Sequence, residues 1–164
     1  MDQDELPVDP DVEVDNHGRG RPSPARMEWA GIGLVFAGGA LGTLSRYLLS
    51  LVIPAWNGLP VPTFVINVTG AFLLGFLLVA LTHSGPDRGA RRSLRLFLGT
   101  GFLGGYTTYS AFAVDADGLI ASADLGGAAL YAAATVIVGA TASFGGMALG
   151  FFAPLHRGDR RRDA

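Results

Sequence analysis

Four long apolar blocks, nearly free of charge, constrain this 164-residue chain more than any other feature of its sequence. They cover residues 29–53, 62–82, 94–121 and 126–154. A helix needs about 20 apolar residues to cross the ~30 Å hydrocarbon layer of a membrane, and each block reaches that length. Because the blocks leave no room for a soluble domain, the sequence predicts an all-α membrane protein with four transmembrane helices.

The two ends of the chain differ in composition from the apolar blocks. Residues 1–28 are acidic, rich in Pro and Asp, and contain no apolar run, which is typical of a disordered extension rather than a targeting sequence. Residues 155–164 form a short basic tail. We therefore expect a four-helix transmembrane domain over residues 29–154. The chain has no cysteine, which excludes disulfides, thiol catalysis and cysteine metal sites.

The arginines lie on one side of the predicted topology. All 12 basic residues are arginine, and all except Arg46 fall before the first block, between or at the edges of the second and third, or after the fourth. The other two connections carry none, and Asp115, Asp117 and Asp124 are assigned to the last of them. By the positive-inside rule we expect a multi-pass protein of the cell inner (plasma) membrane with both termini in the cytoplasm.

Residues 99–112, GTGFLGGYTTYSAF, interrupt the third block. The glycines are poor helix formers, and Thr107, Thr108 and Ser110 offer side-chain hydrogen bonds that compete with the helix. The G-x-G-x-x-G spacing also matches a dinucleotide-binding loop, but that loop needs a preceding strand and an aqueous site. We therefore expect a broken third helix, which is either a kink between packed helices or an ion site built from freed carbonyls.

Small residues recur four positions apart within three of the blocks. The pairs are Gly38 and Gly42, Ala71 and Gly75, and Gly146 and Gly150. This spacing predicts close packing between neighbouring helices.

The polar residues assigned to the spans are almost all neutral hydrogen-bond donors, with no Asp, Glu, Lys or His among them. This argues against a proton relay, acid–base catalysis and metal hydrolysis, so we expect no enzyme. Such donors suit an anion that sheds its water, although each hydroxyl can instead bond back to its own helix. Asn67 has no such local alternative. Arg46 either snorkels to the headgroups or attracts anions to a pore mouth.

Three motifs, in order and each in its own block, resemble the Fluc (CrcB) family of fluoride channels. They are GGALGTLSRY at residues 38–47, NVTGAFLLG at 67–75 and GFLGGYTTYSAF at 101–112. The resemblance covers about residues 29–153. It implies a fluoride-selective channel that lowers fluoride toxicity by passive efflux, built as an antiparallel two-subunit assembly with pathways lined by both subunits.

The resemblance also implies roles for individual residues. The fluoride pathway would include Asn67, Tyr109, Ser110, Phe112, Tyr131 and Thr135. Arg46 would lie near the vestibule, and the backbone carbonyls of Gly104 and Thr107 would hold a structural, central Na⁺ ion at the helix break. The chain departs from the family at Tyr109, where Phe is usual, and the added hydroxyl needs a partner.

Two other functions compete with the channel. A small four-span transporter of the multidrug type would need an intramembrane carboxylate. A non-transporting assembly subunit would use the break only as a packing kink. The expected partners are the lipid bilayer, fluoride and a second subunit, with no nucleic acid. Because the arginines favour one orientation, we expect an oppositely oriented paralogue as the second subunit rather than a second copy of the chain itself.

Overall fold

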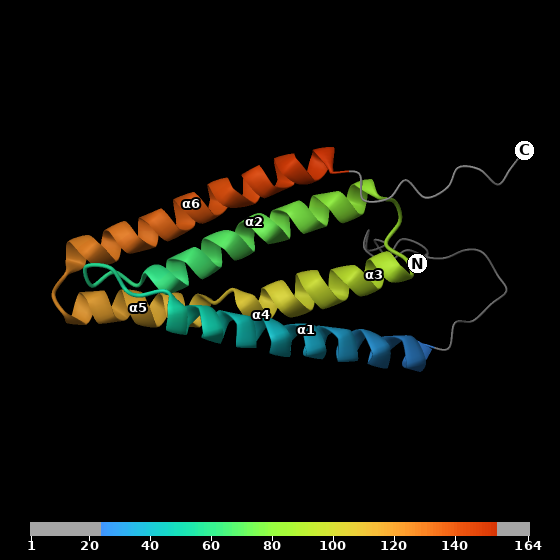
Figure 1. The fold of residues 1–164 in the computed structure, drawn as a ribbon, viewed down its shortest axis with the longest axis horizontal. Helices are drawn as coiled ribbons and strands as arrows, with labels where there is room; N and C mark the ends of the chain where they lie inside the picture. Colours follow the sequence, from blue (N-terminus) through green and yellow to red (C-terminus); the bar gives the residue numbers. More distant parts are fainter. Residues whose placement is uncertain (1–23, 154–164) are drawn as a thin grey trace, which may run out of the picture.

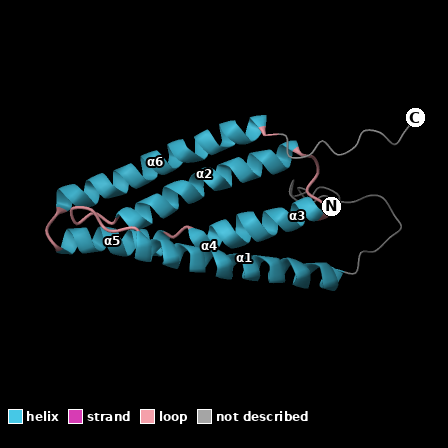
Figure 2. Cartoon of the chain, in the orientation of Figure 1, coloured by secondary structure: helices cyan, strands magenta, loops and turns pink. Residues whose placement is uncertain are grey.

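The computed structural model describes residues 24–153, and within this range the chain forms helices and no strand (Figures 1 and 2). The three long helices are α1 (Pro24–Val52), α2 (Val61–His83) and α6 (Leu125–Phe152). The third apolar block is divided into α3 (Ala90–Leu94), the π-helical segment η1 (Arg95–Leu103), α4 (Gly104–Tyr106) and α5 (Tyr109–Ala121).

The predicted membrane-spanning blocks correspond closely to these helices. In the described range, α1 from Trp29, α2 and α6 are each long and apolar enough to cross a membrane. The third block also runs along the whole bundle, but as a broken helix (Figure 1). The prediction of an all-α membrane protein with a broken third helix is confirmed. Residues 1–23 of the predicted extension and the whole 155–164 tail lie outside the described residues.

The helices lie roughly side by side rather than around a central core. The order across the molecule is α6, α2, the α3–η1–α4 run and α1, and α5 continues from the break toward α6 (Figure 1). Large apolar side chains cover the outside; Phe36, for example, is 78% exposed. Such surfaces are stable only against lipid or another subunit.

Glycines allow α1 to approach the third helix closely. A Cβ atom on Gly38 would overlap the Phe97 carbonyl oxygen, and one on Gly42 would overlap the Phe102 carbonyl. Both obstacles are backbone atoms, which cannot move aside by a rotamer change. The first predicted small-residue pair therefore packs as expected.

A similar approach joins α2 and α6. A Cβ atom on Gly146 would meet the Phe72 carbonyl oxygen, and one on Gly150 would meet that of Phe76. Gly75 on α2 faces the backbone of α6 in the same way. Close packing at these predicted positions is therefore confirmed.

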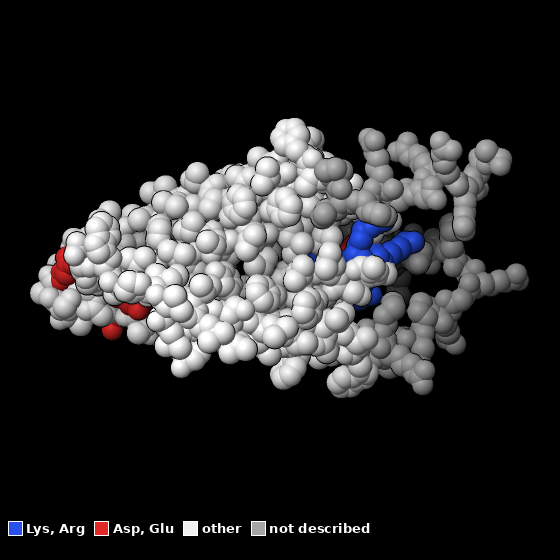
Figure 3. All heavy atoms as spheres, viewed as in Figure 1, with Lys and Arg blue, Asp and Glu red and all other residues white. Residues whose placement is uncertain are grey.

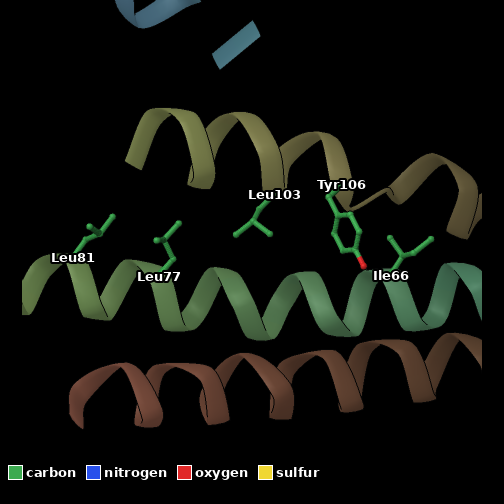
Figure 4. Packing of buried hydrophobic residues seen from close by; sticks show 5 residues of the cluster. All are labelled: Ile66, Leu77, Leu81, Leu103 and Tyr106. Carbon is green, nitrogen blue, oxygen red and sulfur yellow. The ribbon is translucent and has the colours of Figure 1, made fainter. Parts of the chain in front are cut away.

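The buried apolar cores are small. One cluster joins α2 to the third helix through Ile66, Leu77, Leu81, Leu103 and Tyr106 (Figure 4). A second cluster joins α5 to α6 and contains Leu119, Ala128 and Tyr131. The two clusters hold the two halves of the broken helix to different neighbours.

The two ends of the molecule carry opposite charges. Arginines gather at the α2–α3 end, and aspartates lie at the other end (Figure 3). At the arginine end, Arg95 Nε and Nη2 donate hydrogen bonds of 2.9 and 2.6 Å to Asp87 Oδ2. The hydrogen bond from Arg95 lowers the pKa of Asp87 below its usual value of 3.8.

This ion pair predicts a small loss of stability in acid. Because the pKa of Asp87 is lower in the folded state, the pair stabilises the protein above the usual pKa and stops doing so as the pH falls below about 4. Both side chains are well exposed, so the effect is less than about 1 kcal/mol. We expect Asp87→Asn to lower the thermal midpoint slightly at pH 7 and by less at pH 3.

The matched control is Asp117→Asn, since the Asp117 side chain makes no hydrogen bond or ion pair among the described residues. A midpoint difference for Asp87→Asn that stays the same from pH 7 to pH 3 would contradict this interpretation.

Candidate functional site

The third helix breaks at Thr107 and Thr108. The chain leaves α4 at Tyr106, and Thr107 has φ −74° and ψ 159°. Thr108 has φ −151° and ψ 124°, and α5 begins at Tyr109. These two residues are extended, so the helix is interrupted and not merely bent. The break lies beside Tyr106 and Ile66 in the packed interior (Figure 4).

Asn67 from α2 pairs with the backbone of Thr108. The Thr108 N–H donates to Asn67 Oδ1 at 2.8 Å, and Asn67 Nδ2 donates to the Thr108 carbonyl at 2.9 Å. The side-chain amide therefore pairs with the N–H and the carbonyl of one residue, as a peptide group of a neighbouring β-strand would. Since the backbone N–H can only donate and the carbonyl can only accept, one orientation of the amide satisfies both. The second N–H of Asn67 has no partner among the described residues.

Two side chains of α1 bind the carbonyl of Gly105, just before the break. Arg46 Nε and Thr43 Oγ1 each donate to this oxygen at 3.3 Å. The carbonyl has lost its helical donor because the helix does not continue. A cation at this helix end also opposes the negative end of the helix dipole.

A cavity of about 530 Å³ opens between α1, α2 and the start of α5. Arg46 is the only charged residue in its lining. The polar lining residues are Thr43, Tyr47, Ser50, Thr63 and Thr108. The Arg46 side chain thus combines a backbone contact with a position at the wall of a mostly apolar cavity, rather than extending only toward headgroups.

The remaining predicted pathway residues lie along α5 and α6. Ser110 Oγ is 3.2 Å from Thr108 Oγ1, next to the Asn67 contact. The ring centroids of Tyr109 and Phe112 are 6.0 Å apart, and those of Phe112 and Tyr131 are 5.4 Å apart. The structure therefore brings these residues into two short connected groups that meet at the break.

Two of the predicted pathway residues differ in whether their hydroxyl groups already have a hydrogen-bond partner. Thr135 donates its hydroxyl to the Tyr131 carbonyl at 2.7 Å, which is the local back-bond that competes with any ligand role. Tyr109 is 81% exposed, and its hydroxyl has no partner among the described residues.

Asp115 lies beside the candidate site, and the sequence did not identify it. The assignment of Asp115 and Asp117 to a connection is wrong, since both lie on α5 and the turn comprises residues 122–124. Tyr131 donates its hydroxyl to Asp115 Oδ2 at 3.4 Å. A carboxylate therefore lies beside a predicted pathway residue. The spacing of Asp115 from Phe112 along one helical face was the only available signal.

The backbone at the break fits the predicted cation site. The N–H groups that would cover the Gly104 and Thr107 carbonyl oxygens in a continuous helix donate elsewhere, from Thr108 to Asn67 Oδ1 and from Ala111 to Thr108 Oγ1. Carbonyl oxygens without donors are suitable ligands for a hard cation. The two residues implied for Na⁺ are therefore free to serve as ligands.

Comparison with known proteins covers all of this region. A family model described as CrcB-like protein, Camphor Resistance (CrcB), matches residues 33–147. A curated relative, the fluoride-specific ion channel FluC 2 of Leifsonia xyli subsp. xyli, is 56% identical over 135 residues, covering 82% of this chain and 93% of the relative. FluC of Rhizobium meliloti is 44% identical over 118 residues, 71% of this chain and 92% of the relative.

Proposed function

Because the chain belongs to the CrcB-like family, we propose that it is a fluoride-selective ion channel through which cytoplasmic fluoride leaves the cell passively, which lowers fluoride toxicity. The observation that carries this proposal is the similarity to relatives named fluoride-specific ion channels. The family match extends over all four crossings of the bundle, including the broken helix.

The proposed pathway begins beside the break. Fluoride is small and strongly hydrated, so donors must replace its water as it crosses. The free N–H of Asn67 and the hydroxyl of Ser110 are the donors closest to Thr108. Tyr109 and Phe112 add ring edges, which carry partial positive charge.

The continuation along α6 requires two hydroxyls to change partners. Tyr131 now donates to Asp115, and Thr135 donates to its own helix. Each must turn its O–H toward the anion for the ion to pass. Tyr131 and Thr135 must therefore give up a present hydrogen bond to donate to the anion, whereas Asn67 can use its free N–H without doing so.

A structural Na⁺ ion is the second part of the proposal. The carbonyl oxygens of Gly104 and Thr107 would hold it, and the loss of their helical hydrogen-bond donors supports this assignment. Uncovered carbonyls are costly in a membrane interior. A bound cation supplies the charge that offsets this cost.

The proposed assembly is an antiparallel pair of subunits in the cell inner membrane. The exposed apolar surface and the single layer of helices support a requirement for a partner. The one-sided arginines favour insertion with both termini in the cytoplasm, so the second subunit is an oppositely oriented paralogue. Equal populations of both orientations in a tag-accessibility assay would favour a homodimer instead.

Asp115 provides a specific reason to consider proton-coupled transport of the multidrug type, since a carboxylate beside a pathway is what such a transporter needs. A passive channel makes a different prediction. In liposomes, a passive channel should add no pH-driven fluoride accumulation beyond that of protein-free liposomes, into which neutral hydrogen fluoride diffuses, and Asp115→Asn should leave this result unchanged. Uphill fluoride movement that follows the pH gradient and disappears in Asp115→Asn would instead identify a coupled transporter.

The proposed cellular role is tested in a bacterial strain that lacks its own fluoride exporter. We expect expression of the chain, with its paralogue where one is required, to raise the fluoride concentration that stops growth by about tenfold or more. Asn67→Ala should abolish this protection. An assembly subunit would give no protection in any combination.

A further inference from the structure

We propose that Asn67, together with the Thr108 side chain, determines which backbone carbonyls of the broken helix are free to bind a cation. This inference rests on the proposed Na⁺ site. It assigns Asn67 a positioning role in addition to its proposed contact with fluoride.

The Gly104 carbonyl is free because Asn67 takes its donor. In an unbroken α-helix the N–H of residue i bonds to the carbonyl of residue i−4, so the Thr108 N–H would cover Gly104. Here that N–H donates to Asn67 Oδ1 at 2.8 Å. The Asn67 side chain therefore competes directly with the helical hydrogen bond that would otherwise cover a cation ligand.

The Thr107 carbonyl is free for a parallel reason. Its helical donor would be the Ala111 N–H. That N–H donates instead to Thr108 Oγ1 at 3.1 Å, which is the side-chain cap at the start of α5. Each of the two carbonyls implied for Na⁺ has therefore lost its donor to a particular side chain.

The neighbouring carbonyls are covered instead. Arg46 and Thr43 donate to Gly105, and Asn67 Nδ2 donates to Thr108. The side chains around the break thus leave the Gly104 and Thr107 oxygens free and occupy those of Gly105 and Thr108.

Cation binding and the Asn67 contact should therefore stabilise each other. If the Asn67 amide is lost, the Thr108 N–H is free to cover Gly104, and a cation must then displace it. Linkage requires that such a competing contact weaken the cation affinity. An Asn67 that only contacts the anion would have no such effect.

The test measures sodium-dependent thermal stability of the purified full-length protein in detergent without fluoride. Na⁺ is titrated against a background of K⁺ at constant ionic strength. A ligand that binds only the folded state raises its stability with concentration, so the titration reports an apparent affinity. The variants are Asn67→Ala and Thr108→Val, each of which removes one of the two side-chain contacts.

We expect the wild type to be stabilised by Na⁺, and the half-maximal Na⁺ concentration to rise at least tenfold in both variants. The matched control is Thr69→Val on the same helix. Its hydroxyl contacts Tyr106 and the helix backbone but neither Thr107 nor Thr108, so the Na⁺ midpoint should stay at the wild-type value.

Each outcome separates the inference from the proposals on which it rests. An unchanged Na⁺ midpoint in the variants would overturn the role of Asn67 and Thr108 and leave the cation site standing. If Na⁺ does not change the thermal stability of the wild type, both the cation site and this inference are overturned. The proposed fluoride transport is tested separately, by the release of fluoride from liposomes. If Asn67→Ala does not fold, Asn67→Gln replaces it, because the extra methylene displaces the amide from the Thr108 backbone; Thr108→Val tests the Thr107 carbonyl separately.

Discussion

Gly42→Ala is expected to destabilise the folded protein by about 2 kcal/mol, although alanine normally stabilises a helix relative to glycine by up to about 1 kcal/mol. The reason is the close approach of α1 to the third helix. The new Cβ would overlap the Phe102 carbonyl oxygen, and the other atoms that it meets also belong to the backbone, which cannot move aside by a rotamer change. The thermal midpoint in detergent, read from the monodisperse protein that remains after heating, measures the change.

Gly33→Ala on the same helix is the matched control, since a Cβ at Gly33 meets no atom within 4 Å. This variant should be as stable as the wild type or slightly more so. Equal behaviour of the two variants would contradict the close packing of α1 against the third helix. A loss of stability at Gly33 alone would have the same meaning.

Arg46→Met is expected to lower the fluoride flux by about tenfold at low ionic strength. Arg46 is the only charged residue in the lining of the cavity between α1, α2 and the start of α5, and a fixed positive charge there raises the local anion concentration. Arg46→Lys should retain most of the flux because it keeps the charge. The measurement is initial fluoride efflux from liposomes at two salt concentrations.

The salt dependence separates the two roles that the structure gives to Arg46. Added salt screens a long-range attraction, so the difference between wild type and Arg46→Met should shrink as ionic strength rises. The other outcome is a difference in fluoride flux that does not depend on salt, with Arg46→Lys as impaired in flux as Arg46→Met. Arg46 would then act only through its hydrogen bond to the Gly105 carbonyl.

Hydropathy and local composition were enough to predict the membrane-spanning blocks and the break. Both depend on short-range chemistry, since length and polarity define a span and clustered glycine and threonine weaken a helix. Glycine spacing likewise predicted the close approaches at Gly42 and Gly146. The π-helical form of η1 was not predicted, and no residue in it requires that form by its local preference.

The contacts of the site could not be predicted because they join distant parts of the chain. Asn67 and Thr108 are 41 residues apart, and Arg46 and Gly105 are 59 apart. Asn67 was identified because its amide needs a partner, but the sequence does not say which backbone group supplies one. Asp115 was misassigned because a charged residue near the end of an apolar block suggests a connection.

The most direct test of the proposed function is fluoride release from liposomes, followed with a fluoride electrode and compared with chloride release. The protein is reconstituted alone and with its oppositely oriented paralogue. We expect rapid, selective fluoride release from the competent pair, and release by the chain alone would remove the need for a paralogue. Equal release of chloride, or no fluoride release in either preparation, would contradict a fluoride-selective channel.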